Sequence, residues 1–184
     1  VRNAMSRRQA SYLHGYAADE QRRLIAQAGY WRDTLICPDL PFKPGDSLLD
    51  IGCGVGAVLG VVAERYPGLR LAGIDAEPKQ IRAASQHLRG VGDGPPDLRV
   101  GDAAALPWAD ATFDHAYMMW FIEHLREDVA LRVLREALRV RRPGGTITIN
   151  ETDYTTFKVW PPSPDWDALE RAQHLHAVGA VAQA

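Results

Sequence analysis

Residues 48–57, LLDIGCGVGA, decide the fold that this sequence predicts. The apolar run at 47–51 suits a buried strand, and Gly52, Gly54 and Gly56 follow it directly. A strand that turns at once into a helix needs residues that adopt positive φ, and a ligand near the backbone needs positions without side chains. The helix that follows would offer free N–H groups and the positive end of its dipole. We therefore interpret this turn as a cradle for a nucleotide or nucleoside.

Strands and helices are predicted to alternate on both sides of this turn. The strands are expected at 47–51, 69–75, 98–100, 114–120 and 146–150, and the helices at 17–36, 57–66, 77–90 and 126–141. An Arg-Pro-Gly-Gly turn is expected between the last helix and the last strand. This alternation is typical of the α/β class, with a doubly wound, mostly parallel sheet. Ligands of such sheets bind at the carboxyl ends of the strands.

Composition narrows the function classes. The chain has 184 residues, of which 46% are hydrophobic, and this is enough for one domain with a core. The net charge of -2 gives no support for a nucleic-acid partner or an anionic membrane. No apolar run has the length of a membrane span, and the first residues lack the apolar centre of a secretory signal. The two cysteines, Cys37 and Cys53, form no disulfide framework, so we expect a cytoplasmic protein.

Taken alone, the glycine turn leaves two classes of cofactor open, a single nucleoside or nucleotide and a dinucleotide such as NAD(P). Gly52, Gly54 and Ala57 also fit the G-x-G-x-x-A pattern of dinucleotide-binding proteins. Asp75, at the end of the second strand, could accept hydrogen bonds from a ribose diol in either class. An NAD(P)-dependent oxidoreductase is therefore the first alternative.

Two acidic residues favour a nucleoside or nucleotide cofactor over a dinucleotide. Asp50 lies inside the first strand, where dinucleotide-binding folds usually have an apolar residue. Its carboxylate could accept N–H groups of the glycine loop or reach an ammonium group on the ligand. Asp102 follows the third strand, where it could accept from an adenine amino group, with the backbone of Ala103 beside it.

The order of these motifs resembles the class I S-adenosylmethionine-dependent methyltransferases, in particular bacterial enzymes that methylate small molecules. The matching stretches are LLDIGCGVG, GIDAEP, GDAAALPW, FDHAYMMWFIEHL and RVRRPGGTI, and the resemblance extends from residue 12 to about residue 176. It implies a Rossmann-like methyltransferase fold, S-adenosylmethionine as the cofactor and methyl transfer to a small-molecule acceptor. The atom that receives the methyl group stays open.

The resemblance also implies roles for single residues. The backbone of Gly52, Cys53 and Gly54 would contact the methionine part of the cofactor, Asp75 would hold both ribose hydroxyls, and Asp102 and Ala103 would bind the adenine edge. Residues expected near these groups are Ala76 and Gln80, and one or two of Met118, Met119 and Trp120 at the sulfonium end of the cofactor. Each role has a purely structural counterpart: Asp75 could cap the next helix, Asp102 could form a turn, and Met118 and Trp120 could pack in the core.

Other residues carry weaker hypotheses. Tyr12 and Tyr16 would share one helix face and could close the site over the cofactor carboxylate. Glu123 and His124 resemble a catalytic dyad but suit the start of a helix equally well, so no catalytic residue is assigned. We expect no metal site, because His174 and His176 would lie on different faces of a helix.

The resemblance suggests three regions: an N-terminal helical lid and connector at 1–46, a cofactor-binding core at 47–151 and a partial substrate-covering segment at 152–184. After the fifth strand the sequence predicts one helix, about 166–178, and shows no pattern for the two closing strands of the family. We therefore expect an exposed sheet edge, which could support homo-oligomers. A truncated fragment or a cofactor-binding protein without catalysis is the second alternative.

Overall fold

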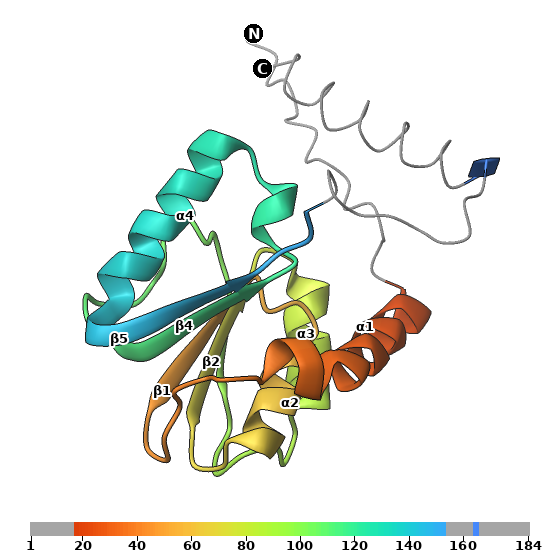
Figure 1. The fold of residues 1–184 in the computed structure, drawn as a ribbon, viewed down its shortest axis with the longest axis horizontal. Coiled ribbons are helices and arrows are strands. Elements are labelled where there is room, and N and C mark those ends of the chain that lie inside the picture. The colour runs from red at the N-terminus through yellow and green to blue at the C-terminus, as the bar shows by residue number, and fades with distance from the viewer. Residues whose placement is uncertain (1–16, 154–163, 166–184) are drawn as a thin grey trace, which may run out of the picture.

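Five parallel strands form one sheet in the part of the chain that the computed structural model describes, residues 17–153 and 164–165 (Figure 1). The strand order is β3-β2-β1-β4-β5. The strands are β1 (Ser47–Ile51), β2 (Arg70–Asp75), β3 (Asp97–Val100), β4 (Phe113–Met119) and β5 (Arg141–Asn150). The predicted α/β class with a doubly wound, parallel sheet is confirmed.

The strand order reverses between β1 and β4, and this reversal fixes where a ligand can bind. Leu49 of β1 pairs with Ala72 of β2 on one side and with Ala116 of β4 on the other. The chain reaches β2 and β3 from one edge of β1, then crosses back to β4 and β5. At such a reversal the loops that follow the two central strands diverge and leave a crevice at their carboxyl ends.

Helices cover both faces of the sheet (Figure 1). The helices α1 (Ala18–Trp31), α2 (Ala57–Arg65) and α3 (Pro78–His87) lie on one face, and α4 (Glu127–Val140) lies on the other. Each face has its own apolar core: Leu59 and Leu88 belong to the first, and Val133 and Ala137 to the second. Because both faces are covered, all five residues of β1 are buried, including the polar residues Ser47 and Asp50.

Two helices end earlier than the sequence predicts. The helix expected at 17–36 is regular only to Trp31 and continues as a π-helical turn, η1 (Arg32–Ile36). The buried Tyr117 hydroxyl donates to the carbonyl of Ile36 (3.0 Å), so a contact with β4 holds the end of this turn. The helix expected at 77–90 ends at His87, and Gly90 adopts a φ of +77° three residues later.

The Arg-Pro-Gly-Gly segment lies within β5 and not before it. β5 begins directly after α4, with Arg141 opposite Phe113, and the next paired residues are His115 and Thr146. The extra residues bulge out of the strand, and Gly144 supplies the positive φ (+81°) that the bulge requires. The expected turn is thus present, but the strand starts five residues earlier than predicted.

Several sequence-based expectations lie outside the described residues. These are the positions of Tyr12 and Tyr16, the helix at about 166–178 and the question of closing strands after β5. Among the residues that are described, none belongs to a helix with the length and apolar character needed to cross a membrane.

Candidate functional site

A cavity of about 230 Å³ opens at the carboxyl ends of β1, β2 and β4. The glycine turn forms its floor, α1 contributes Leu24 and Ala28 to one wall, and the segment after β4 forms another wall. Eight of the residues predicted to bind the cofactor line it: Asp50, Gly52, Cys53, Gly54, Asp75, Ala76, Gln80 and Met119. The strand order therefore brings together residues that are up to 69 positions apart in the chain (119 − 50 = 69).

The glycine turn depends on left-handed backbone. Gly52, Gly54 and Gly56 have φ values of +78°, +51° and +72°, where a residue with a Cβ would be strained. The N–H groups of Gly52 and Cys53 both donate to the carbonyl of Ile74, at 2.9 and 3.0 Å. These two bonds fasten the turn to the end of β2, and the turn then leads directly into α2.

Asp75 also holds the turn. Its Oδ2 accepts a hydrogen bond from the Gly54 N–H (3.0 Å), and its Oδ1 accepts one from the Glu77 N–H (2.8 Å). Burial raises the pKa of Asp75, and these two bonds oppose that rise. The carboxylate thus forms the turn before α3 and also lines the cavity. The cap of α3 that was the structural alternative for Asp75 is instead Glu77, whose side chain accepts the N–H of Lys79 (3.0 Å).

Asp50 plays a different part from one that the sequence suggested. The expectation that its carboxylate could accept N–H groups of the glycine loop is wrong, because those groups donate to Ile74 and Asp75. Asp50 is 2% exposed, and its Oδ2 has no hydrogen-bond partner in the described part of the chain. Burial, assisted by the nearby Asp75, raises the pKa of Asp50 to about 8.

An unpaired carboxyl oxygen in a buried cavity is a costly feature, since polar groups lose their hydration on burial. A cationic group in the cavity would supply the missing partner and stabilise the ionised form. The orphaned oxygen of Asp50 and the adjoining glycine cradle therefore fit a ligand that combines an ammonium group with polar atoms near the backbone.

A second cavity of about 110 Å³ lies beside the first. It contains Asp102 and Ala103 after β3, and Val129 and Val133 of α4 form its far side. The Asp102 side chain is exposed, and its Oδ1 accepts the Ala104 N–H (2.8 Å), which is the turn predicted as its structural role. Gly52, Asp75, Ala76 and Phe121 line both cavities.

Phe121 stands at the junction of the two cavities. A Cβ built on Gly52 would lie 2.5 Å from Cγ of the Phe121 ring, so the ring packs directly against the glycine backbone. The ring therefore borders both spaces, and an elongated ligand that filled them would pass beside it.

The end of β4 sends neighbouring side chains to opposite faces of the sheet, as the period of a strand requires. Met119 lines the larger cavity, together with Trp120. Met118 is fully buried in the core between the sheet and α4 and lines neither cavity. Core packing is thus the role that the structure gives to Met118. Trp120 adopts a φ of +51°, and its N–H donates to the Asn150 carbonyl (3.0 Å).

Cys53 and Gln80 are buried parts of the cavity wall. Burial, with further contributions from Asp50 and Asp75, raises the pKa of the Cys53 thiol well above its usual value, so the nucleophilic thiolate is disfavoured. Its Sγ packs on Gly73 of β2, where an added Cβ would lie 2.9 Å away. Gln80 is 4% exposed, and its Oε1 accepts from Nε2 of Gln21, which joins α1 to α3 (3.3 Å).

Sequence reasoning missed some of the residues that shape the site. Phe121 lines the larger cavity and belongs to the motif after β4, so its position was a signal that went unused. His124, which the sequence suggested only as one half of a dyad with Glu123, lines the same cavity. Leu24 and Ala28 show only the apolar spacing of any helix. Glu151, which binds the segment after β4, carries no sequence signal at all. In the described ranges, no group of three or more metal-binding side chains is present.

Comparison with known proteins agrees with this geometry. Residues 49–149 match the family model described as "Methyltransferase domain". The chain is 37% identical over 112 residues to norajmaline N-methyltransferase of Rauvolfia serpentina, covering 60% of this chain and 37% of the relative. It is 33% identical over 147 residues to 27-O-demethylrifamycin SV methyltransferase of Amycolatopsis mediterranei, covering 75% of this chain and 50% of the relative. The chain thus spans half or less of these two relatives.

Solved structures show the same fold. A SAM-dependent methyltransferase from Methanosarcina mazei superposes with a TM-score of 0.53 and 29% identity, covering 59% of this chain and 53% of that chain. The [4+2]-cyclase SpnF superposes with a TM-score of 0.56 and 27% identity, covering 77% of this chain and 49% of that chain.

Proposed function

Since this chain belongs to the class I S-adenosylmethionine-dependent methyltransferases, we propose that it transfers a methyl group from S-adenosylmethionine to a small-molecule acceptor. The observation that carries the proposal is the unpaired, buried Asp50 oxygen beside the left-handed glycine turn. A cofactor with an ammonium group and a carboxylate fits this pair of features.

The two cavities suggest which residues would bind each part of the cofactor. Asp50 and the backbone of Gly52, Cys53 and Gly54 would hold the amino-acid part in the larger cavity. Asp75, which lines both cavities, would accept from the ribose hydroxyls. Asp102 and Ala103 in the smaller cavity would bind the adenine. Ala76, Gln80 and Met119 complete the walls, and Tyr12 and Tyr16 stay as proposed lid residues.

S-adenosylmethionine supplies an electrophilic methyl group on a sulfonium, and the residues of the chain align and shield the reactants. Alignment of two bound molecules is a large part of catalysis for such a transfer. Leu24, Ala28 and Phe121 give the larger cavity apolar walls that exclude water. We assign no general base, since a base is needed only for acceptors that must lose a proton.

Two alternatives make different predictions. An NAD(P)-dependent oxidoreductase is not favoured, because the named relatives are methyltransferases and Asp50 occupies a position that is usually apolar in dinucleotide folds. A protein that binds the cofactor without methyl transfer is the other alternative. A fold shared with a cyclase illustrates that the reaction depends on the site and not on the fold.

The acceptor, partners and location extend the proposal. Small-molecule acceptors are supported by the names of the relatives. We further propose self-association through the edge of β5, which pairs with β4 on one side only in the described sheet. A cytoplasmic location is supported by the two free, buried cysteines. The lid, core and covering segment at 1–46, 47–151 and 152–184 stay as the proposed division of the chain.

Calorimetry with S-adenosylhomocysteine tests the proposal. We expect the wild-type protein to bind with micromolar affinity and Asp75→Ala to weaken binding by about 1.5–3 kcal/mol, the range for hydrogen bonds to a charged group. Asp97→Ala is the matched control, because it also removes a hydrogen-bonded carboxylate but one outside both cavities.

Each outcome of this experiment has a distinct meaning. If Asp75→Ala and Asp97→Ala bind equally well, Asp75 does not hold the ligand. If the wild type binds NADH and not S-adenosylhomocysteine, the oxidoreductase is correct. Binding without transfer to any acceptor in a screen would support the non-catalytic alternative.

A further inference from the structure

Glu151 binds the backbone of the segment that follows β4. It lies directly after β5, and both oxygens of its carboxylate face the N–H groups of residues 121–123. The Phe121 N–H donates to Oε1 and Oε2 (3.1 and 3.0 Å), and the Ile122 N–H donates to Oε1 (2.9 Å). The Glu123 N–H lies 3.4 Å from Oε2.

A return contact closes the arrangement. Oε2 of Glu123 accepts the N–H of Thr152 (2.9 Å), so the two segments hold each other through side chain and backbone in both directions. The N–H groups at the start of the 3₁₀ turn η2 (Ile122–His124) are therefore bound by the carboxylate of Glu151, the residue that follows β5. The preceding residue, Asn150, is joined to the same segment through its carbonyl, which accepts the N–H of Trp120.

Asn150 also joins β5 to η1, the turn that continues α1. Its Nδ2 donates to the hydroxyl of Tyr117 (2.6 Å) and to the carbonyl of Leu35 (3.1 Å), which belongs to η1 at the end of α1. Two consecutive residues, Asn150 and Glu151, thus connect η1 and the segment after β4 to the end of one strand.

The segment that Glu151 binds carries three residues of the larger cavity, Trp120, Phe121 and His124. Trp120 has left-handed backbone, which is uncommon for a residue with a large side chain and needs support from its surroundings. The Phe121 ring packs on Gly52, so any shift of its backbone would change the border between the two cavities.

We propose that Glu151 is a positioning residue for cofactor binding: its carboxylate fixes the backbone of residues 121–123 and thereby holds the Phe121 ring against Gly52. The inference rests on the proposed function. Glu151 lines neither cavity, so it acts through the segment that it binds and not by contact with the ligand.

The test compares Glu151→Gln with a control, Glu136→Gln. Gln keeps the size of the side chain and removes the negative charge and one acceptor oxygen. Glu136 is a fair match, because its carboxylate accepts a loop N–H, that of Leu106 (2.7 Å), and also lies outside both cavities. Two properties are measured: amide hydrogen exchange of residues 121–123 in the ligand-free protein, and the affinity for S-adenosylhomocysteine by calorimetry.

For Glu151→Gln we expect exchange at residues 121–123 to be at least about tenfold faster and the affinity to fall about 5- to 10-fold. Glu136→Gln should lower the melting temperature by about as much as Glu151→Gln does. It should leave the exchange rate of residues 121–123 and the affinity for S-adenosylhomocysteine within about twofold of the wild type. A purely structural role for Glu151 would make the two variants behave alike.

Three results would overturn the inference. Unchanged exchange in Glu151→Gln would show that the carboxylate does not order the segment. Faster exchange with equal or higher affinity would show that an ordered Phe121 is not needed or obstructs the ligand. A wild-type protein without affinity for S-adenosylhomocysteine would refute the proposed function and the cofactor role, whereas the exchange data would still decide whether Glu151 orders the backbone.

Discussion

The ring of Phe121 packs directly on the backbone of Gly52, so that a Cβ at position 52 would lie 2.5 Å from the Cγ of Phe121. Gly52 follows β1 and Phe121 follows β4, the two central strands between which the strand order reverses. The contact makes Gly52 sensitive to substitution for two separate reasons, its left-handed backbone and the closeness of the ring.

Gly52→Ala should destabilise the protein by more than backbone strain alone. Left-handed backbone costs an alanine about 1–2 kcal/mol, and the contact with Phe121 adds to this cost. Gly90→Ala isolates the first contribution, because Gly90 has nearly the same φ (+77° against +78°) and nothing within 4 Å of an added Cβ. Urea unfolding should therefore give a larger loss for Gly52→Ala than for Gly90→Ala.

A double variant separates the two causes further. Phe121→Ala removes the ring and should recover part of the stability that Gly52→Ala loses, so that the two substitutions are not additive. Equal losses at positions 52 and 90, or strict additivity in the double variant, would contradict the packing of the ring on Gly52.

Asp50→Asn should change the pH dependence of stability in the ligand-free protein. The pKa of Asp50 is raised to about 8 in the folded state, against about 3.9 in an unfolded chain. A carboxyl with a raised pKa contributes stability that is fully present below the unfolded value and is lost as the pH rises through the folded value. The wild type should therefore lose stability relative to Asp50→Asn between about pH 4 and pH 8.

Urea unfolding of both proteins at pH 5.5, 7.0 and 8.5 measures this difference. Groups that do not interact with Asp50, such as His87, whose pKa is lowered by burial, contribute to both proteins and largely cancel in the comparison. A constant difference across the three pH values would mean that Asp50 is ionised throughout, and therefore paired.

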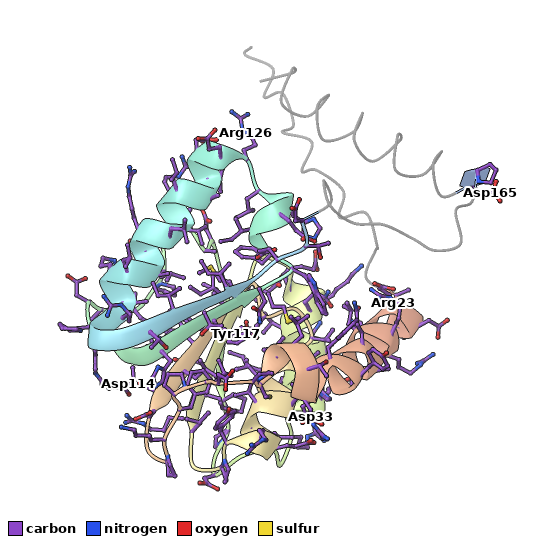
Figure 2. All side chains as sticks on the ribbon, viewed as in Figure 1. Arg23, Asp33, Asp114, Tyr117, Arg126 and Asp165 are labelled. Carbon is purple, nitrogen blue, oxygen red and sulfur yellow. The ribbon has the colours of Figure 1, made fainter. Side chains whose placement is uncertain are left out.

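Asp114 predicts the opposite pH dependence at the other end of the sheet, where Figure 2 shows it near the start of β4. Burial alone would raise the pKa of Asp114, but hydrogen bonds from the Ser47 hydroxyl (2.7 Å) and Arg142 (2.6 Å) hold it well below its usual range. A depressed pKa contributes stability above the unfolded value, about 3.9, and this contribution is lost as the pH falls through the folded value.

Asp114→Asn should cost about 1.5–3 kcal/mol at pH 7, the range for hydrogen bonds that involve charged groups. The cost should shrink below about pH 4, where the Asp114 carboxyl of the unfolded wild-type chain begins to gain a proton while that of the folded protein is still ionised. Denaturation curves at pH 7 and pH 3 measure both values. An equal cost at both pH values would show that charge plays no part in the Ser47–Asp114–Arg142 contact.

Local patterns predicted most of the fold. The apolar run of β1 and the glycines after it mark a buried strand and a tight turn, and both are present where the sequence places them. The π-helical turn η1 was missed because its end is held by Tyr117, which lies 81 residues from Ile36 in the chain. The bulge in β5 was read as a turn before the strand, since Gly144 signals a positive φ but not which residues pair beside it.

The site residues were predictable where the local sequence around a residue also shows that it lies at the end of a strand. Asp50, Gly52 and Asp75 stand at strand ends that the topology must bring together. Whether a carboxylate binds a ligand or a loop N–H depends on which other acceptors lie near that N–H. The contact expected between Asp50 and the glycine loop was wrong because Ile74 and Asp75 of β2 accept from the loop instead. Glu151 could not be found, because its role exists only through its contact with residues 121–123.

The Cys53 side chain occupies space that is free only because Gly73 has no side chain, and this limits which residue pairs can occur at these positions in related sequences. An added Cβ at Gly73 would also lie 3.0 Å from Leu98 Cδ2, so the sulfur and the leucine together fill the room above β2. Positions 53 and 73 should therefore covary among homologues: a chain with alanine at position 73 would need a smaller residue at position 53. A substitution at one position would be retained in evolution together with a compensating substitution at the other. The residue between Gly52 and Gly54 could then change while the turn keeps its backbone conformation.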